Sequence, residues 1–527
     1  MNNTINKPET GFAGLKKYWN TDIIAGFSVF LLAMPLSLGI AKASGFPPAM
    51  GLLTAMIGGL VVSMFKVSEL TIKGPAAGLI TICAGAVADF GGDEKGWHYA
   101  CATIVVMGII QFILSFLKIG RFSSFFPLSA VHGMLAAIGL IIIAKQIPIL
   151  LGVDPALAKG LAPLVLYSKV PFFFANLNPT IALIGGISLA IMFGLYFFPI
   201  EKIKKIPAPT FVLLVAIPLA MYLDFKGTQP GYALVKIGNF WKEVTINADF
   251  SRIGEVAFWK YVLIFLFVNS LESILTVKAI DGRDPYKRKT DYDQDLRGLA
   301  VGNALSGLLG GLPMISEVAR SMANKNNGAI TKWSNFFHGG FLLLAMLLLI
   351  PVIEMIPNAA LASMLIVVGY NLANPKEFIH SWKIGIDQFL VFIVTIAVTL
   401  LEDLLLGIAA GVLVSFIFQI IHKVPFGSFF AAKTEQNDTG KQTHELVIKG
   451  GATFSNYVGI KESLEKLPTS ETVVLDVQQC QYIDHTVLEN FHNFQEEYNE
   501  NGGKLTIVGL DKFRSLSSHP LSGKVLI

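Results

Sequence analysis

The sequence predicts an all-α, multi-pass membrane protein of about fourteen transmembrane segments, followed by a small α/β domain. Two observations lead to this fold class. Of 527 residues, 53% are hydrophobic and only 15% are charged, whereas soluble domains carry about 25% charged residues. Charge is also unevenly spread, because it is sparse from Thr21 to His422 and ordinary after Lys423. We therefore expect a polar N-terminus at 1–20, a membrane domain at 21–424 and a soluble domain at 443–527.

The membrane domain contains apolar runs that approach or reach the roughly 20 residues needed to cross a bilayer. With their weakly polar flanks, the clearest lie at 23–41, 104–117, 181–198, 340–353 and 389–401. A large buried core does not account for so many long runs with so few charges. The segments begin near Asp22, Pro48, Pro75, His98, Leu128, Thr180, Pro209, Lys260, Leu296, Ser316, Asn335, Asn358, Ile386 and Glu402.

Loop charge predicts the orientation, because short cytoplasmic loops are rich in lysine and arginine. With fourteen spans, the basic residues fall on the side of both termini, so we expect both termini in the cytoplasm and the protein in the cell (inner) membrane. The polar N-terminus lacks an A-x-A cleavage site, and we expect no removable signal peptide. The basic residues are Lys16, Lys17, Lys66, Lys118, Arg121, Lys202, Lys204, Lys205, Arg283, Lys287, Arg288, Lys289, Lys325, Lys332, Lys376, Lys383 and Lys423.

Two segments, 75–88 and 316–324, are too short to span. Each follows a Gly/Pro break, at Gly74-Pro75 and at 310–313, and they are the third and tenth of fourteen. Interrupted segments at matching positions of two halves indicate an inverted-repeat transporter. Non-helical backbone at membrane depth lines a cavity or is buried in protein. The alternative is two poorly delimited ordinary helices.

The starts of these short helices form a candidate anion site, because a helix N-terminus carries unpaired N–H groups and partial positive charge. Pro75 suits a first helical position, and Ser316 could cap the second helix. Antiparallel repeats would make the two N-termini face each other. Arg320 lies one turn into the second helix, where its guanidinium could bind an oxyanion in bidentate fashion. The alternative is a structural counter-ion to Glu317.

The eighth segment carries an acid, Glu272, in the middle of an apolar span. Asn269, Glu272 and Thr276 share one helical face. Their oxygens could hold Na⁺, or desolvation could make the acid carry a proton. The alternative is a buried acid that is paired only for structure.

Other chemistry is not indicated. There is no G-x-x-x-x-G-K-[S/T] motif, so nothing suggests that ATP drives a cycle. The three cysteines (Cys83, Cys101, Cys480) and nine histidines lack ligand spacing, and His132 and His338 fit packing or hydrogen-bonding roles. The net charge of +4 does not point to nucleic acid. We expect no enzyme activity and no cofactor apart from a possible Na⁺.

The C-terminal region reads as an α/β domain after a polar linker at 434–442. Short strands are expected at 445–449, 472–477 and 504–509, and helices at 458–467 and 486–500.

Several motifs, taken in order along the chain, resemble the SulP (sulfate permease) family of anion transporters, and the tail resembles a STAS domain. In the first half they are Asp22-Ile23-Ile24-Ala25-Gly26, Pro35, Gly45-Phe46-Pro47-Pro48-Ala49-Met50-Gly51-Leu52 and Gly74-Pro75-Ala76-Ala77. In the second half they are Glu272-Ser273-Ile274-Leu275-Thr276, Asp281-Gly282, Gly302-Asn303, Gly310-Gly311-Leu312-Pro313, Ala319-Arg320-Ser321, Asn324 and Gly328. The tail carries Val473-Val474-Leu475-Asp476 and Ile483-Asp484-His485-Thr486.

The resemblance implies seven-plus-seven inverted repeats, a core domain that moves against a gate domain, and often a homodimer in the lipid bilayer. It places the anion between the third and tenth helices, and with the cap this gives Ala76, Ala77, Ser316, Ala319, Arg320 and Ser321. It makes Glu272 the coupling acid, with Thr276 at the spacing of a sodium site in bicarbonate-transporting members.

Two positions depart from the family pattern. Glu317 stands where a small residue is usual, and it joins Glu272, Thr276 and Asn269 as a candidate coupling residue. The tail reads His485-Thr486-Val487 where Ser/Thr-Ser/Thr-Gly is expected, which argues against phosphorylation at Thr486.

The expected function is therefore secondary active transport of a small inorganic anion, sulfate or bicarbonate, coupled to Na⁺ or H⁺. Alternatives are an anion exchanger, a channel-like uniporter, a nucleobase-type permease, and an anion sensor that signals through the tail.

Overall fold

The computed structural model describes residues 7–92, 95–117, 126–201, 206–440, 443–468, 471–500 and 502–527. The chain forms two compact units, Met1–Gly120 with Ile138–Asn371, and Arg121–Ala137 with Leu372–Ile527. Helix α5 (Leu128–Leu150) contributes to both. The basic residues at 118, 121, 202, 204 and 205 and the end of the expected linker at 441–442 lie outside the described residues.

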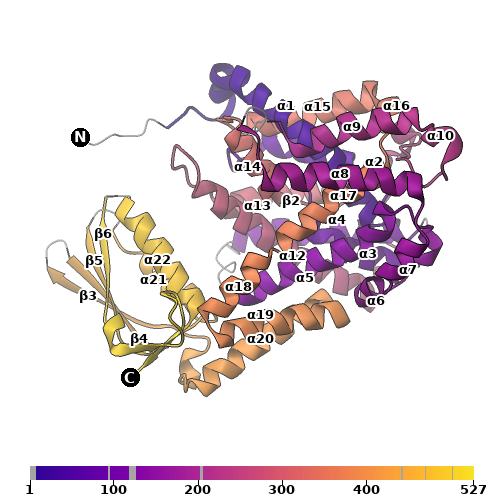
Figure 1. The fold of residues 1–527 in the computed structure, drawn as a ribbon. Coiled ribbons are helices and arrows are strands. Elements are labelled where there is room, and N and C mark those ends of the chain that lie inside the picture. Colours follow the sequence, from indigo (N-terminus) through magenta and orange to yellow (C-terminus); the bar gives the residue numbers. More distant parts are fainter. Residues whose placement is uncertain are drawn as a thin grey trace. The chain divides into compact units, whose positions relative to one another are not determined.

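All fourteen expected segments coincide with helices or strand–helix units of the described chain (Figure 1). Among the described residues, six helices are long and apolar enough to cross a membrane, and five apolar helices are shorter. In the first unit the helices are α1 (Gly11–Ala43), α2 (Pro48–Leu60), α3 (Ile80–Asp89), α4 (Gly96–Leu114), α6 (Pro163–Ser168), α7 (Val170–Ala175), α8 (Pro179–Phe197), α9 (Ala208–Tyr222), α10 (Phe225–Thr228), α11 (Phe240–Glu243), α12 (Val256–Asp281), α13 (Tyr292–Leu308), α14 (Val318–Asn326), α15 (Trp333–Leu348), α16 (Ile350–Ile353) and α17 (Asn358–Leu372). The second unit adds α18 (Pro375–Ile384), α19 (Ile386–Leu401) and α20 (Leu404–Ile421).

Glycines allow close helix packing inside the first unit, as is common where membrane helices meet. A Cβ on Gly59 of α2 would stand 2.5 Å from Cα of Gly339 on α15. The two backbones therefore touch, and α2 and α15 are held against each other beside the candidate site.

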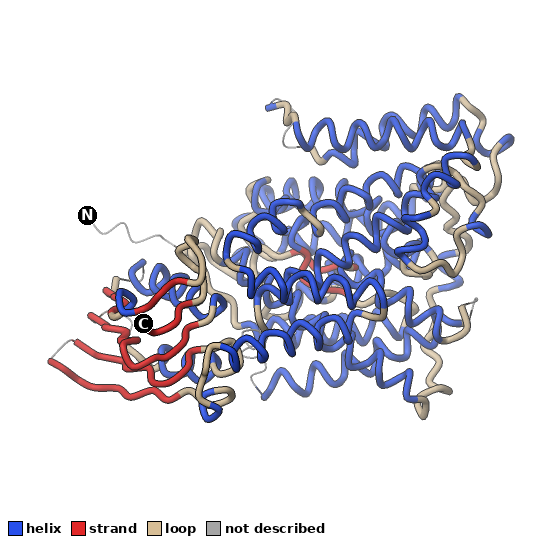
Figure 2. The backbone as a smooth tube through the Cα atoms, turned by 60° about the horizontal axis from the view of Figure 1, so that its bottom comes forward, coloured by secondary structure: helices blue, strands red, loops and turns tan. Residues whose placement is uncertain are grey.

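A two-stranded ribbon lies among the helices of this unit and appears in red in Figure 2. Strand β1 (Ile72–Pro75) pairs antiparallel with β2 (Met314–Glu317), with Ile72 opposite Glu317 and Pro75 opposite Met314. The expectation that the short segments are helical from Pro75 and from Ser316 is therefore wrong. Residues before a proline favour extended backbone, so the break at Gly74-Pro75 extends into a strand.

The second unit ends in a mixed sheet of order β3-β4-β5-β8-β7, with β6 also paired to β5. Its core contains Val473, Leu475 and Val477 from one face of β5, packed with Val487 and Phe491 of a helix. The strands are β3 (Lys433–Gly440), β4 (Thr443–Ala452), β5 (Thr472–Ile483), β6 (Lys504–Val508), β7 (Phe513–Ser515) and β8 (Lys524–Leu526), and the helices are α21 (Tyr457–Glu465) and α22 (His485–Glu500).

The expected strands and helices of this domain are all present, but its start was misplaced. Residues 434–440, interpreted as a polar linker, belong to β3, which pairs with β4 from Lys433 opposite Lys449. An edge strand is polar on its open side, and its sequence therefore resembles a linker.

Candidate functional site

The ribbon places the starts of two short helices close together in the first unit. After Pro75 the chain passes through a short 3-10 turn (Ala77–Leu79) into α3, and after Glu317 it enters α14. Because β1 and β2 are antiparallel, the helices leave the ribbon at opposite ends and their N-termini point toward each other. Four strand residues at about 3.3 Å each set the two ends of the ribbon about 10–13 Å apart. This arrangement suits a small anion.

Arg320, one turn into α14, is fully buried. None of its three guanidinium nitrogens has a hydrogen-bond partner among the described residues. Its Nη1 lies 2.5 Å from where a side chain on Gly74 would begin, so the guanidinium rests on the backbone of β1. A buried, unpaired cation is costly, and the natural complement is an anion.

Glu317, rather than Ser316, caps α14. Its carboxylate accepts the backbone N–H of Arg320 at 2.7 Å. The cap proposed for Ser316 is therefore wrong, since Ser316 is the third residue of β2 and its hydroxyl meets the ammonium of Lys73. The side chain of Arg320 forms no ion pair with Glu317 among the described contacts, because its guanidinium nitrogens are all unpaired.

The remaining candidate substrate residues divide into two groups. Ser321 is buried, and its hydroxyl accepts the N–H of Ile72 at 2.9 Å and donates to the carbonyl of Glu317, so it binds α14 to the ribbon. Ala76 and Ala77 are buried at the other helix start, whereas Ala319 is exposed. Around an anion, these alanines could offer backbone N–H groups only.

Glu272 of α12 faces the start of α3. A Cβ on Gly78 would stand 2.1 Å from its Oε1, so the carboxylate packs directly on that backbone. Oε1 is buried and has no hydrogen-bond partner in the described part of the chain. Thr276 lies one turn further along the helix and is also buried. An orphaned carboxylate oxygen near a hydroxyl and peptide groups fits Na⁺, which prefers oxygen ligands, or a proton.

Asn269 belongs to a different cluster from Glu272. Its Oδ1 accepts from Gln111 at 2.9 Å and from Asn303 at 3.2 Å, and its Nδ2 donates to the carbonyl of Met314 at 2.7 Å. Asn303 in turn accepts the N–H of Met314 at 2.7 Å. These amides fix the first residue of β2, and both polar atoms of the Asn269 side chain take part in this cluster.

Sequence reasoning missed the buried ion pair of the ribbon. Lys73 Nζ lies 2.6 Å from Asp295 Oδ2, and neither side chain is appreciably exposed. Lys73 could have been noticed as a lysine inside an apolar stretch, and Asp295 as an acid in the first turn of α13. That the two form an ion pair could not be predicted from the sequence, because 222 residues separate them.

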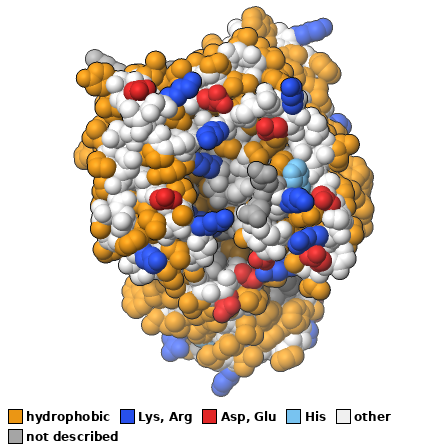
Figure 3. All heavy atoms as spheres, turned by 90° about the vertical axis from the view of Figure 1, so that its right-hand side faces the viewer, with side chains coloured by type: hydrophobic (Ala, Val, Ile, Leu, Met, Phe, Trp, Pro, Cys, Tyr) orange, Lys and Arg blue, Asp and Glu red, His pale blue; other side chains and the backbone are white. Residues whose placement is uncertain are grey.

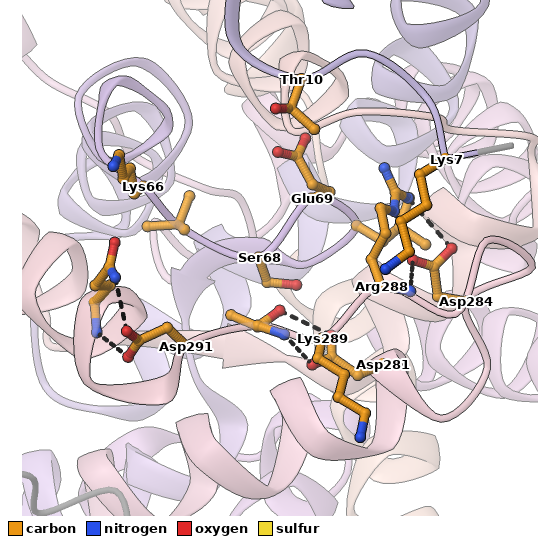
Figure 4. Close-up of a pocket in the computed structure, with 14 residues that line it drawn as sticks. Lys7, Thr10, Lys66, Ser68, Glu69, Asp281, Asp284, Arg288, Lys289 and Asp291 are labelled. Carbon is orange, nitrogen blue, oxygen red and sulfur yellow. Dashed lines mark hydrogen bonds and ion pairs between the residues drawn. The ribbon is translucent and has the colours of Figure 1, made fainter. Parts of the chain in front are cut away.

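A polar cavity of about 310 Å³ lies where the 66–70 loop meets the 281–294 connection (Figure 4). Arg288 and Asp284 are paired in it, with Nε 2.6 Å from Oδ2. Its other charged lining residues are Lys7, Lys66, Glu69, Asp281, Lys289 and Asp291. The mixture of signs gives it no preference for an anion over a cation. On the face of the protein in Figure 3, charged side chains are likewise scattered among hydrophobic ones.

In the C-terminal domain, Thr486 is buried, and its hydroxyl accepts the N–H of Leu128 at 3.1 Å. The hydroxyl therefore contacts the first residue of α5, within the second unit.

The sequence model named "Sulfate permease family" matches residues 19–395. The chain belongs to the sulfate permease family. Members of this family are transporters rather than enzymes, and with its apolar helices the chain is an integral, multi-pass membrane protein.

Relatives cover most of the chain at low identity. A putative sulfate transporter of Bacillus subtilis, YvdB, is 26% identical and spans 95% of this chain and 94% of its own. The bicarbonate transporter BicA of Picosynechococcus is 24% identical over 76% of this chain and 70% of its own. A sodium-independent sulfate anion transporter of Bos taurus is 25% identical over 98% of this chain and 92% of its own.

Solved structures show the same fold. The transmembrane domain of a cyanobacterial BicA matches with a TM-score of 0.64 at 19% identity, over 75% of this chain and 98% of that one. Murine Slc26a9, an anion transporter in its inward-facing state, matches with a TM-score of 0.68 at 14% identity, over 93% of this chain and 86% of that one. The second match extends into the C-terminal region, whose sheet and helices agree with the expected STAS domain.

Proposed function

We propose that this protein is a secondary active transporter of a small inorganic oxyanion, sulfate or bicarbonate, coupled to Na⁺ or H⁺. The observation that carries the proposal is Arg320, a fully buried guanidinium that has no hydrogen-bond partner among the residues that the structure describes and lies beside two opposed helix starts. Relatives named as sulfate and bicarbonate transporters support the same class of substrate.

The acids argue for a coupled cation. Glu272 and Glu317 bring two carboxylates to the region where Arg320 supplies one positive charge. An additional anion would be repelled in a medium of low dielectric constant, unless a cation or proton offsets one carboxylate. Glu272 is the natural place for this cation, because its buried Oε1 is unpaired within the described ranges. Binding of the cation and of the anion would then favour each other.

The membrane potential gives the same argument at the scale of the cell. An anion that enters a negative-inside cell works against about 2.3 kcal/mol per charge per 100 mV. Accumulation therefore needs a co-transported cation or an exchanged anion. Exchange is the second candidate, and the relative named sodium-independent favours it.

The basic loops favour a cell-membrane location with cytoplasmic termini, and the family resemblance favours a homodimer.

The test is uptake of labelled sulfate and bicarbonate into proteoliposomes, measured with an Na⁺ gradient, a proton gradient, or neither. We expect wild-type uptake to depend on one cation, and Glu272→Gln to abolish that dependence. Glu317→Gln should weaken it less, since Glu317 is occupied as a helix cap. Uptake that is independent of both cations but requires an anion inside the proteoliposomes would establish exchange instead. No uptake of either anion would refute the substrate class.

A further inference from the structure

The ion pair of Lys73 and Asp295 stands in the ribbon between the two helix starts. The ammonium of Lys73 donates to Asp295 Oδ1 at 2.7 Å, to Oδ2 at 2.6 Å, and to the hydroxyl of Ser316. An ammonium has three donors, so all of them are used. Lys73 is completely buried and Asp295 nearly so.

The contacts of the pair connect both strands to α13. Lys73 lies opposite Ser316 in the ribbon register, and its ammonium binds that residue's hydroxyl. Asp295, in the first turn of α13, also accepts the N–H of Ser68 at 2.8 Å, just before β1. The side-chain amide of Asn335 accepts the N–H of Lys73 at 3.3 Å. The strand that leads to the α3 start is therefore fixed on both sides.

Stability does not explain a charged pair at this place. A buried ion pair is often no more stabilising than well-packed apolar side chains of similar volume, whereas removal of one partner leaves an uncompensated charge. What such a pair does provide is a defined local charge. Lys73 is next to Gly74, on which the guanidinium of Arg320 rests, and therefore an unbalanced charge at 73 or 295 would act directly on a bound anion.

We propose that Lys73 and Asp295 are positioning residues of the anion site: the pair fixes the β1–β2 ribbon, and Asp295 cancels the charge of Lys73 so that Arg320 remains the net positive charge that the anion meets. This inference rests on the proposed anion transport. It assigns the pair no direct contact with the anion.

The test compares Lys73→Met, Asp295→Asn and the double variant by the KM and maximal rate of anion uptake in proteoliposomes. Lys73→Met leaves a carboxylate and should raise KM roughly tenfold, the effect of one charge about 10 Å away at an effective dielectric constant near 20. Asp295→Asn leaves an ammonium and should lower KM and also the rate, because the anion is released more slowly. The neutral double variant should return KM to near the wild-type value.

Opposite shifts in KM separate this role from a structural one, which would move both single variants in the same direction. The matched control is Arg288→Met with Asp284→Asn, an ion pair of the same 2.6 Å length on the connection after α12, which should show no such split. If Lys73→Met does not accumulate, Lys73→Gln also removes the positive charge and keeps a polar side chain toward Asp295 and Ser316. The proposal is overturned if the wild type transports the anion and the KM of the two single variants is unchanged or shifts in the same direction. A wild type that transports no anion refutes the proposed function instead.

Discussion

Two charged side chains of the site lie against glycines of the same segment. The guanidinium of Arg320 occupies the space beside Gly74, and the carboxylate of Glu272 the space beside Gly78. Between these glycines run Pro75, Ala76 and Ala77, which have no polar side-chain atoms. The absence of side chains at 74 and 78 therefore lets one cation and one anion approach the backbone that a substrate would share.

At Arg320, we expect Arg320→Ala to weaken anion uptake roughly ten- to hundredfold, the range for a lost charged hydrogen-bonding group. Arg320→Lys should retain part of the affinity, because it keeps the charge but loses the bidentate fork. Uptake kinetics measure both, and size-exclusion profiles in detergent check that the variants are folded. Normal uptake with unchanged KM in Arg320→Ala would remove Arg320 from the binding site.

At Gly78, we expect Gly78→Ala to mimic the loss of Glu272, since the new methyl would stand 2.1 Å from Oε1 and displace the carboxylate. Cation dependence of uptake should fall at least severalfold, while the protein remains folded. Gly186→Ala is the control, because no described residue lies within 4 Å of where its new methyl would stand. Equal cation dependence in the two variants would show that the position of Glu272 does not matter.

At the scale of elements, the sequence predicted where helices break but not what the broken segments do. Gly74-Pro75 and the 310–313 run located both interruptions, because proline and glycine act locally. The pairing of Ile72 with Glu317 joins residues far apart in the chain, and strands of four residues leave no periodic pattern. Separation along the chain also explains why the ion pair of Lys73 and the amide cluster of Asn269 were not predicted. The partners of both residues come from other helices and from β2.

Helix α22 begins at a buried acid with an unusual titration. Asp484 accepts the N–H groups of Val487, at 2.7 Å, and of Phe454. Burial nevertheless raises its pKa from 3.8 to about 7, and the charge of Asp387 adds to this rise. Between these values the folded domain binds more protons than the unfolded chain, so this carboxyl makes the domain less stable as pH rises from about 4 to 7.

We therefore expect the C-terminal domain to open more readily at pH 8 than at pH 6, and Asp484→Asn to lose this difference. Cys480 of β5 is fully buried, and its labelling by a thiol reagent in a Cys83→Ala, Cys101→Ala background reports opening. The ratio of wild-type to Asp484→Asn labelling rates removes the intrinsic pH dependence of the thiol. That ratio should rise severalfold from pH 6 to pH 8, and a constant ratio contradicts the prediction.

At the scale of the whole molecule, every residue proposed for anion or cation binding lies in the first unit, and the C-terminal sheet lies in the second. The sequence predicted a boundary near residue 423, where the density of charge changes. The two units instead divide between Asn371 and Leu372, so that α18, α19 and α20 are grouped with the sheet. The start of the C-terminal domain was also missed, since β3 has the polar composition of a linker. Within the second unit, Thr486 contacts Leu128 of α5 at 3.1 Å, and the hydroxyl of Ser517 donates to the last carbonyls of α18.

We expect removal of 433–527 to preserve uptake with a KM within about threefold of wild type, because no proposed site residue is lost. The rate or the proposed dimerisation should change, since the contacts to α5 and α18 disappear. Removal of 443–527 should behave worse, because it keeps β3 without β4 and leaves an unpaired strand edge that promotes aggregation. Uptake kinetics, yield and molecular mass in detergent distinguish the two truncations. A folded 433–527 deletion that binds and transports no anion would show that the C-terminal domain is part of the transport machinery.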